Sequence, residues 1–319
     1  MEEDKGGGVF GIFSLLVLLT LLAGSIYFLW LNLPSEPVEL IAIEKKIKDE
    51  IPIKPEYSTS KQFYENMRFP DREISYRIEP LCGSKKASEV EEAFGILESK
   101  TIINFYPASS QNTQIRILCS EIAPEQGKEG YFVAGEGGPT EVINTTLYSV
   151  ILSGKVSFFR EEKCEKPNIA IHEILHVLGF NHNNNPKSIL YETLACDQTI
   201  DDSIINDINS LYSVDSKPDL KIVNLKATKA GGYLNFNIEI INQGLKNVNN
   251  VKLGIYADDK FIKEFDLENI EIGTRKFLDV QNLKISRSAD KITFVVNEDR
   301  EIEELFVANN KLELVLAES

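Results

Sequence analysis

The histidines of this chain constrain its fold more than any other feature. All three of them, His172, His176 and His182, lie in one short segment of a 319-residue chain. His172 and His176 are four positions apart, so on an α-helix they share one face and lie one turn from each other. Gly179 can adopt the left-handed backbone conformation that ends a helix, and the chain can then bring His182 back to the same point. The pattern predicts three imidazoles that converge on one metal ion.

The chemistry of such a site favours zinc. Three neutral imidazoles leave one tetrahedral position for a water molecule, which is typical of a catalytic zinc and not of a structural one. Glu173, next to His172, is placed to act as the general base. A bare HExxH match arises by chance, but the glycine and the third histidine in register make this match much rarer. We therefore predict one zinc ion bound by His172, His176 and His182, with Glu173 as the catalytic residue.

A further motif follows the third histidine. After a turn-rich stretch the chain continues with Ser188-Ile189-Leu190-Tyr191. Together with the histidine motif, this segment resembles the metzincin metallopeptidases and, among them, the matrixins, whose third histidine is followed at this spacing by a Ser-Ile-Met-Tyr "Met-turn". Leu190 takes the methionine position and Tyr191 follows it. In the family the methionine is an apolar floor under the ligands, and leucine nearly keeps its volume and apolarity.

The resemblance implies a fold and an activity. It covers roughly residues 69–212 and implies an α+β catalytic domain, at residues 68–214, with a twisted sheet and an active-site helix. The residue pattern agrees, with strands expected at 73–79, 101–105 and 114–118 and helices at 87–100 and 201–212. We interpret residues 135–139 as a surface turn without chemistry. The family implies a zinc endopeptidase acting on protein or peptide substrates, and a calcium ion held by carboxylates and carbonyls stays open.

The N-terminal part predicts a membrane anchor. No charge interrupts the chain from Gly6 to Ser35, so we expect a short tail at 1–7 and a transmembrane signal-anchor helix at 8–33. A cleaved signal peptide is the alternative, because the small residues Ala23 to Ser25 would suit cleavage, but the apolar run continues past them. Residues 34–67 mix prolines with charges and predict a stalk or linker.

The four cysteines indicate an oxidising compartment. Cys82, Cys119, Cys164 and Cys196 all follow the anchor, and their even number suits two disulfides. Three connectivities are open, one of which would bracket the histidine motif with Cys164 and Cys196, and buried free thiols are the alternative. We expect a single-pass protein of the cell membrane with an extracytoplasmic catalytic domain, although the lysines beyond the apolar run do not support an N-terminus inside.

A second domain is expected at residues 217–319. Apolar and polar residues alternate from 234 to 240, and strand-like runs recur at 251–256, 291–296 and 311–316, which favours a β-sandwich. Three marks resemble the adhesion-related, Ig-like domain called CARDB, namely Pro218-Asp219-Leu220, Ile241-Asn242-Gln243-Gly244 and the stretch 303–310. The resemblance implies an all-β sandwich that acts as a spacer or contacts another surface, for example a cell-surface partner.

Composition limits the remaining choices. The formal net charge of −15 discourages binding to nucleic acid, because both partners would be negative. The chain as a whole predicts a membrane-anchored zinc-dependent endopeptidase that hydrolyses peptide bonds by a zinc-activated water with a glutamate general base. Two alternatives remain: a catalytically impaired surface adhesion or binding protein, and a zinc amidase that acts on cell-wall material.

Overall fold

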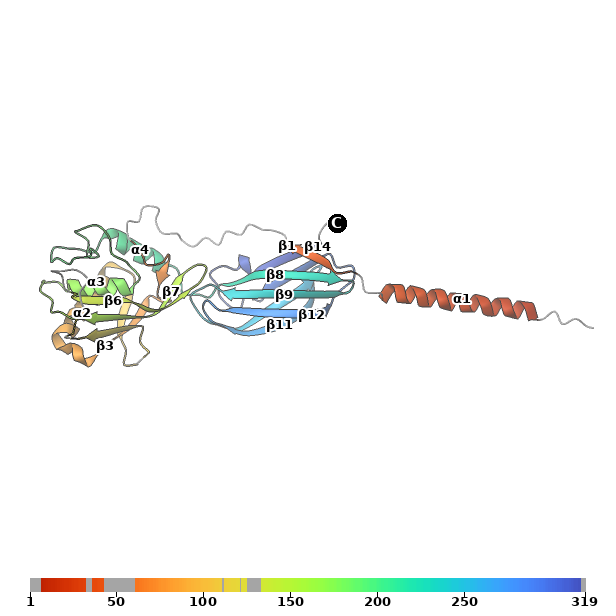
Figure 1. Cartoon of the computed structure of the whole chain (residues 1–319), viewed down its shortest axis with the longest axis horizontal. Coiled ribbons are helices and arrows are strands. Elements are labelled where there is room, and N and C mark those ends of the chain that lie inside the picture. The colour runs from red at the N-terminus through yellow and green to blue at the C-terminus, as the bar shows by residue number, and fades with distance from the viewer. Residues whose placement is uncertain are drawn as a thin grey trace, which may run out of the picture.

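The computed structural model describes residues 7–32, 36–42, 61–110, 112–120, 122–124 and 133–316. Figure 1 shows two folded parts beside each other along the long axis, with helix α1 (Gly7–Asn32) beyond the second part. The first part is a mixed α/β domain, and the second is built of strands. This division agrees with the expected α+β domain followed by an all-β domain.

Helix α1 covers most of the expected anchor, and its side chains are described for residues 13–29. Within the residues that the structure describes, no helix has both the length and the apolar composition needed to cross a membrane. The transmembrane helix expected at 8–33 therefore has no support from the described part of the chain.

The first part is a twisted sheet with helices packed on it. Its order is β2-β7-β5-β3-β4, all of these pairings are parallel, and β6 pairs antiparallel with β7 at the open edge. The strands are β2 (Met67–Arg68), β3 (Glu73–Ile78), β4 (Asn104–Pro107), β5 (Ile115–Cys119), β6 (Gly135–Asn144) and β7 (Ser149–Phe158). The helices are the 3-10 turn η1 (Pro80–Cys82), α2 (Gly83–Lys100), α3 (Asn168–Val177) and α4 (Asp202–Ser213). The strands expected at 73–79 and 114–118 and both expected helices are confirmed; the strand expected at 101–105 begins later.

One expectation in this domain is wrong. Residues 135–139 do not form a surface turn; they are the first half of strand β6. Gly135 and Gly137 lie where β6 packs directly on α3 and a Cβ atom would not fit. Glycine is used wherever two backbones approach this closely.

The second part is an eight-stranded sheet that curls around one apolar core, with the order β11-β10-β13-β14-β1-β8-β9-β12. The strands that follow α4 are β8 (Leu220–Ala230), β9 (Tyr233–Asn242), β10 (Val248–Ala257), β11 (Lys260–Ile270), β12 (Arg275–Lys284), β13 (Lys291–Val296) and β14 (Lys311–Leu316), with the 3-10 turn η2 (Ala308–Asn310) before the last. The inward-facing residues of β9, Leu234, Phe236, Ile238 and Ile240, are buried as the alternation predicts.

Strand β1 (Val38–Ala42) corrects the expected stalk at 34–67. Residues 38–40 pair with β8 and residues 40–42 pair with β14, so β1 links two groups of strands that are otherwise unpaired with each other. Leu40 at the crossing point is buried in the core of the sandwich. The stalk is also wrong for residues 61–67, because Gln62 forms a β-bridge with Phe180 and β2 joins the first sheet. A domain inserted between β1 and β8 therefore separates two pieces of one sandwich.

Candidate metal centre

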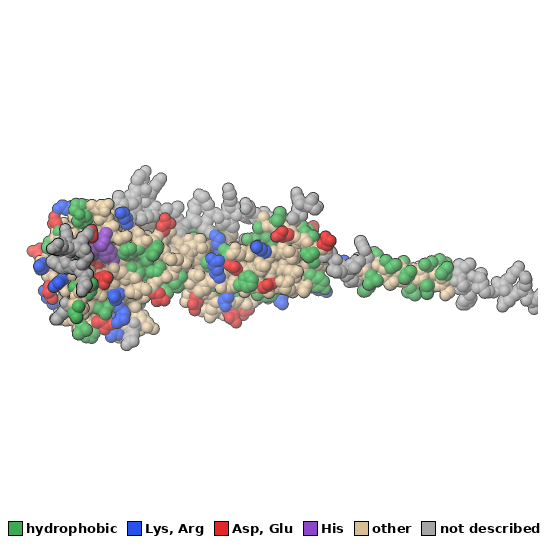
Figure 2. Space-filling view, viewed as in Figure 1, with side chains coloured by type: hydrophobic (Ala, Val, Ile, Leu, Met, Phe, Trp, Pro, Cys, Tyr) green, Lys and Arg blue, Asp and Glu red, His purple; other side chains and the backbone are tan. Residues whose placement is uncertain are grey.

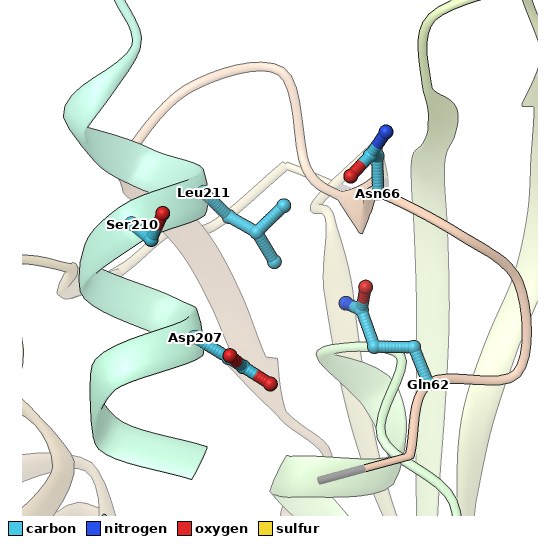
Figure 3. Close-up of a pocket in the computed structure, with 5 residues that line it drawn as sticks. All are labelled: Gln62, Asn66, Asp207, Ser210 and Leu211. Carbon is cyan, nitrogen blue, oxygen red and sulfur yellow. The ribbon is translucent and has the colours of Figure 1, made fainter. Parts of the chain in front are cut away.

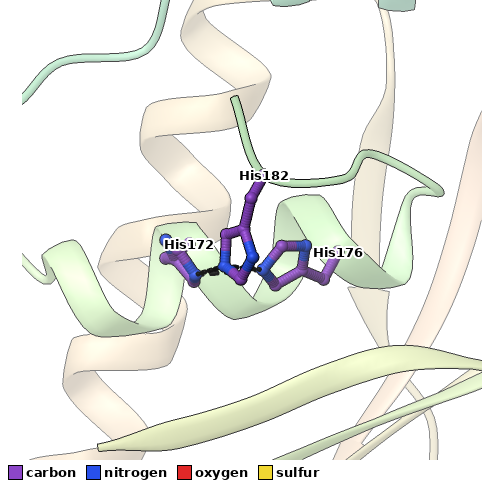
Figure 4. A group of neighbouring side chains, drawn as sticks. All are labelled: His172, His176 and His182. Carbon is purple, nitrogen blue, oxygen red and sulfur yellow. Dashed lines mark hydrogen bonds between the residues drawn. The ribbon is translucent and has the colours of Figure 1, made fainter. Parts of the chain in front are cut away.

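Helix α3 carries His172, Glu173 and His176 and is buried along its whole length. Its first turn is stabilised by Glu162, whose carboxylate accepts the backbone N–H of Ile169 at 2.9 Å, because the first N–H groups of a helix have no partner within it. The helix ends at Val177, and Gly179, two residues later, has a φ of 96°. The chain turns back there, and His182 faces the two helical histidines (Figure 4).

The three imidazoles meet at their Nε2 atoms. The Nε2 atom of His172 lies 2.9 Å from that of His176, and the Nε2 atom of His182 lies 3.2 Å from each of them. Zinc–nitrogen bonds of 2.0–2.1 Å in a tetrahedral site place the nitrogens about 3.3 Å apart. Within the described residues, these three form the one group of His, Cys, Asp and Glu side chains close enough to hold a metal ion. The donor set therefore fits zinc.

The other ring nitrogens fix the protonation of the site. The Nδ1–H of His172 donates to the carbonyl of Ile189 at 2.6 Å, and the Nδ1–H of His176 donates to the carbonyl of Phe180 at 2.7 Å. Both rings therefore direct an unprotonated Nε2 at the same point, and a metal ion placed there would accept both lone pairs. In metal sites, a carbonyl that accepts the N–H on the far side of a histidine ring fixes the orientation of that ligand.

Burial keeps the histidines neutral. Burial, together with a smaller effect of the neighbouring imidazoles, lowers the pKa of His172 to about 3 and the pKa of His176 to about 4. Burial also lowers the pKa of His182, which is less enclosed. Figure 2 shows histidine side chains at the surface of the first part. Neutral imidazole is the form that binds a metal ion.

The side chain of Glu173 lies at the contact of α3 with strand β6, and Glu173 is 5% exposed. Burial raises the pKa of Glu173 to about 8, and a hydrogen bond from the backbone of Gly137 opposes this rise. A Cβ atom on Gly137 would lie 2.2 Å from the backbone oxygen of Glu173, and a Cβ atom on Gly135 would lie 2.8 Å from its Cγ atom. The glycines of β6 therefore allow the strand to lie against the catalytic candidate.

The comparisons with known proteins agree with this geometry. Residues 68–213 match the family model described as Matrixin, and residues 217–314 match the model described as CARDB. Residues 68–213 are a matrixin-like domain. A stretch of 135 residues is 26% identical to the macrophage metalloelastase of Oryctolagus cuniculus, and it covers 38% of this chain and 27% of that protein. The chain thus spans about a quarter of the length of the curated relative it matches.

The CARDB-like domain is similar to two solved structures of one domain. They are the CARDB domain of a Pyrococcus furiosus protein in a crystal structure with di-metal ions, and its solution NMR structure. Each is 18% identical, with a TM-score of 0.26, and covers 31% of this chain and 88% or 94% of its own chain.

The turn after His182 contacts the metal site of the matrixin-like domain. The carbonyl of Ile189 is the one that holds His172, and Leu190 beside it is 1% exposed in the apolar core. The backbone N–H of Leu190 donates to the hydroxyl of Ser188 at 3.1 Å, and Ser188 in turn bonds Asp201. Tyr191 is half-buried at the end of this turn. The turn therefore holds the ring of His172 through the carbonyl of Ile189, and the leucine next to it is buried in the core.

Both disulfides of the matrixin-like domain flank its core. Cys82 bonds Cys119, and Cys164 bonds Cys196, so one of the three open connectivities is selected. The second bond joins the segment before α3 to the segment after the Leu190 turn. A groove runs between the two disulfides, beside the first turn of α3.

A second, smaller pocket lies where the chain enters the matrixin-like domain (Figure 3). Gln62 and Asn66 line it from the segment around β2, and Asp207, Ser210 and Leu211 line it from α4. The same entering segment borders the metal site, because the backbone N–H of Phe63 donates to the carbonyl of Gly179 at 2.9 Å. This contact supports the turn that delivers the third histidine.

Sequence reasoning brought together the residues of the histidine motif but missed their supports. The carbonyls of Phe180 and Ile189 gave no signal, because every residue has one. The glycines of β6 did give a signal, since Gly135 and Gly137 alternate as residues on one face of a strand do.

Proposed function

We propose that the matrixin-like domain is a zinc-dependent endopeptidase. The observation that carries the proposal is the convergence of three neutral imidazoles, with Nε2 atoms 2.9 to 3.2 Å apart, next to the buried carboxyl group of Glu173. Zinc held there would polarise the scissile carbonyl and lower the pKa of a bound water to about 7. The site supports hydrolysis of an amide bond.

Glu173 moves the proton in this proposal. A carboxylate oxygen of Glu173 takes a proton from the attacking water and then gives it to the nitrogen of the leaving amine. Burial raises the pKa of Glu173 to about 8, which suits a group that must both accept and donate a proton near neutral pH. The Gly137 N–H, which hydrogen-bonds this carboxyl group, holds it at the edge of β6.

The test is digestion of an unfolded protein by the purified chain with zinc. Glu173→Gln should keep zinc, because the ligands are unchanged, and should lower kcat by about 100-fold to 10,000-fold. Glu165→Gln, a change at an exposed glutamate close to α3, is the matched control and should cleave normally. Full, chelator-sensitive activity in Glu173→Gln would dismiss the mechanism. A wild-type chain that binds zinc but cleaves no protein would favour the adhesion or cell-wall amidase alternative.

We also propose that the protein is held at the outer face of the cell membrane. Two disulfides suit an oxidising space. Apolar side chains of α1 are exposed, among them Leu15 at 58% and Leu18 at 64%. Alkaline carbonate should leave the protein in the membrane pellet, and protease added to intact cells should degrade it. Release by carbonate would contradict the anchor, and resistance to protease would contradict the orientation.

A further inference from the structure

The β6–β7 hairpin connects the metal centre to the CARDB-like sandwich. At one end β6 lies on Glu173 through Gly135 and Gly137, as described above. Strand β7 lies on the same helix, because a Cβ atom on Gly154 would be 2.4 Å from Cγ1 of Val177. Figure 1 shows the other end of the hairpin reaching out of its own domain to the tip of the sandwich. One pair of strands therefore contacts both the catalytic candidate and the second domain.

The tip of the hairpin is in direct contact with the CARDB-like sandwich. Leu147, Tyr148 and Val150 of the hairpin form one buried apolar cluster with Leu245 and Ile272 of the sandwich. The hydroxyl of Thr145 donates to the backbone carbonyl of Gln243 at 3.0 Å.

The fit at the tip leaves no spare room. A Cβ atom on Gly273 of the sandwich would be 2.4 Å from Cγ2 of Ile143. The contact is thus apolar, hydrogen-bonded and closely packed, as the buried centre of an interface is.

A polar network within the sandwich lies next to this apolar contact. The Nε2 atom of Gln243 donates to the carboxylate of Asp219 at 2.7 Å. The side-chain oxygen of Asn242 accepts the backbone N–H of Asp219 at 3.2 Å and that of Gly244 at 3.1 Å. The carbonyl of Asn242 accepts the N–H of Gly273 at 2.8 Å. Two of the sequence marks of the CARDB resemblance, 218–220 and 241–244, are therefore hydrogen-bonded to each other, and Gln243 of the second mark contacts the hairpin.

We propose that the sandwich positions the active site through this hairpin. Between Gly137 at the site and Ile143 at the dock, β6 spans about 20 Å as a strand paired with β7. An edge strand held at both ends keeps the Gly137 N–H on the carboxyl group of Glu173. The consequence for catalysis rests on the endopeptidase function proposed above. The CARDB-like domain is then a positioning part of the catalytic unit as well as a surface module.

Hydrogen exchange of the full-length, metal-free protein tests the mechanical part. Leu245→Ala removes a fully buried side chain from the dock, and Leu253→Ala removes the same atoms from the sandwich core away from the hairpin. Backbone amides of residues 135–144 should exchange at least about ten-fold faster in Leu245→Ala than in Leu253→Ala, because a strand released at one end opens locally. Equal exchange of β6 in the two variants would overturn the proposal. Ile272→Ala, a milder loss at the dock, gives the same comparison if Leu245→Ala does not fold.

Kinetics tests the catalytic part. Zinc content should be unchanged in Leu245→Ala, while kcat falls by about ten-fold to 100-fold at nearly constant KM, as a misplacement of about 1 Å does. Leu245→Ile should restore kcat, and Leu253→Ala should leave it within about two-fold. A kcat in Leu245→Ala equal to that of Leu253→Ala would overturn the proposal. An inactive wild type would instead refute the endopeptidase function, and the exchange comparison would still decide the coupling.

Discussion

Substitution of Gly137 by alanine tests how closely strand β6 must lie to the catalytic candidate. The added Cβ atom would be 2.2 Å from the backbone oxygen of Glu173, 2.8 Å from its carbonyl carbon and 2.9 Å from its Cα atom. All three are backbone atoms of a buried helix, so no side-chain rotation relieves the overlap. The strand or the helix has to move.

The size of that movement follows from the contact distances. An ordinary contact at about 3.4 Å requires β6 to withdraw by about 1 Å, and carbon–oxygen pairs are not stable at shorter separations. Overpacking of this kind costs about 1 to 3 kcal/mol of the free energy of unfolding. A shift of about 1 Å at a catalytic group lowers the rate by about 100-fold. We therefore expect a folded Gly137→Ala variant with normal zinc content and a kcat about 100-fold below wild type.

The neighbouring residue supplies the control. Gly138 lies in the same strand, and a Cβ atom there has nothing within 4 Å. Gly138→Ala should match wild type within about two-fold in the hydrolysis of an unfolded protein, with the melting temperature and bound zinc measured on the same samples. Gly137→Ala with wild-type kcat would refute the argument that β6 holds the carboxyl group in place. A loss of equal size in both variants would show that glycine matters in this strand for another reason.

Two further predictions concern stability. Replacing both Cys164 and Cys196 by serine opens a loop with a sequence separation of 32. This should lower the free energy of unfolding, measured by urea titration, by about 4 kcal/mol. An unchanged urea midpoint would contradict a structural role of the disulfide. In chelator, His172 and His176 have pKa values lowered to about 3 and about 4 from 6.5 in the unfolded chain, so their stabilising effect is complete above about pH 6.5 and is lost as the pH falls toward 3. The pKa of Glu173 is raised to about 8, so above pH 4.5 this group changes the free energy of unfolding in the opposite direction to the histidines. The loss of stability should therefore be steepest below pH 4.5. A urea midpoint that stays constant from pH 6.5 to 4 would refute the burial of neutral imidazoles.

The sequence predicted what depends on local spacing. The approach of His172 and His176 follows from helical periodicity, and the glycine exit at Gly179 follows from the conformations that only glycine adopts easily. The residues of β9 that are buried in the core of the sandwich follow in the same way from the alternation of apolar and polar residues along the strand. These features need no knowledge of distant parts of the chain.

The features that the sequence did not predict depend on distant partners. The glycines of β6 have the composition of a turn, but they form a strand because they pair with β7, and Gly135 and Gly137 also lie against α3. Strand β1 is five residues long, and its partners lie near residues 228 and 315. Strands β11 and β12 are at the edges of the sheet and expose many charged side chains, so their apolar periodicity is weak.

The position of β1 determines what a cut in the backbone does. Because β1 belongs to the sandwich, a nick between it and β2 would leave the matrixin-like domain joined covalently to β8, while β1 stays paired on both of its edges. The two fragments would then migrate together on a sizing column and separate only in denaturant. After proteolysis of that connection, the matrixin-like domain would therefore stay associated with the fragment that contains β1.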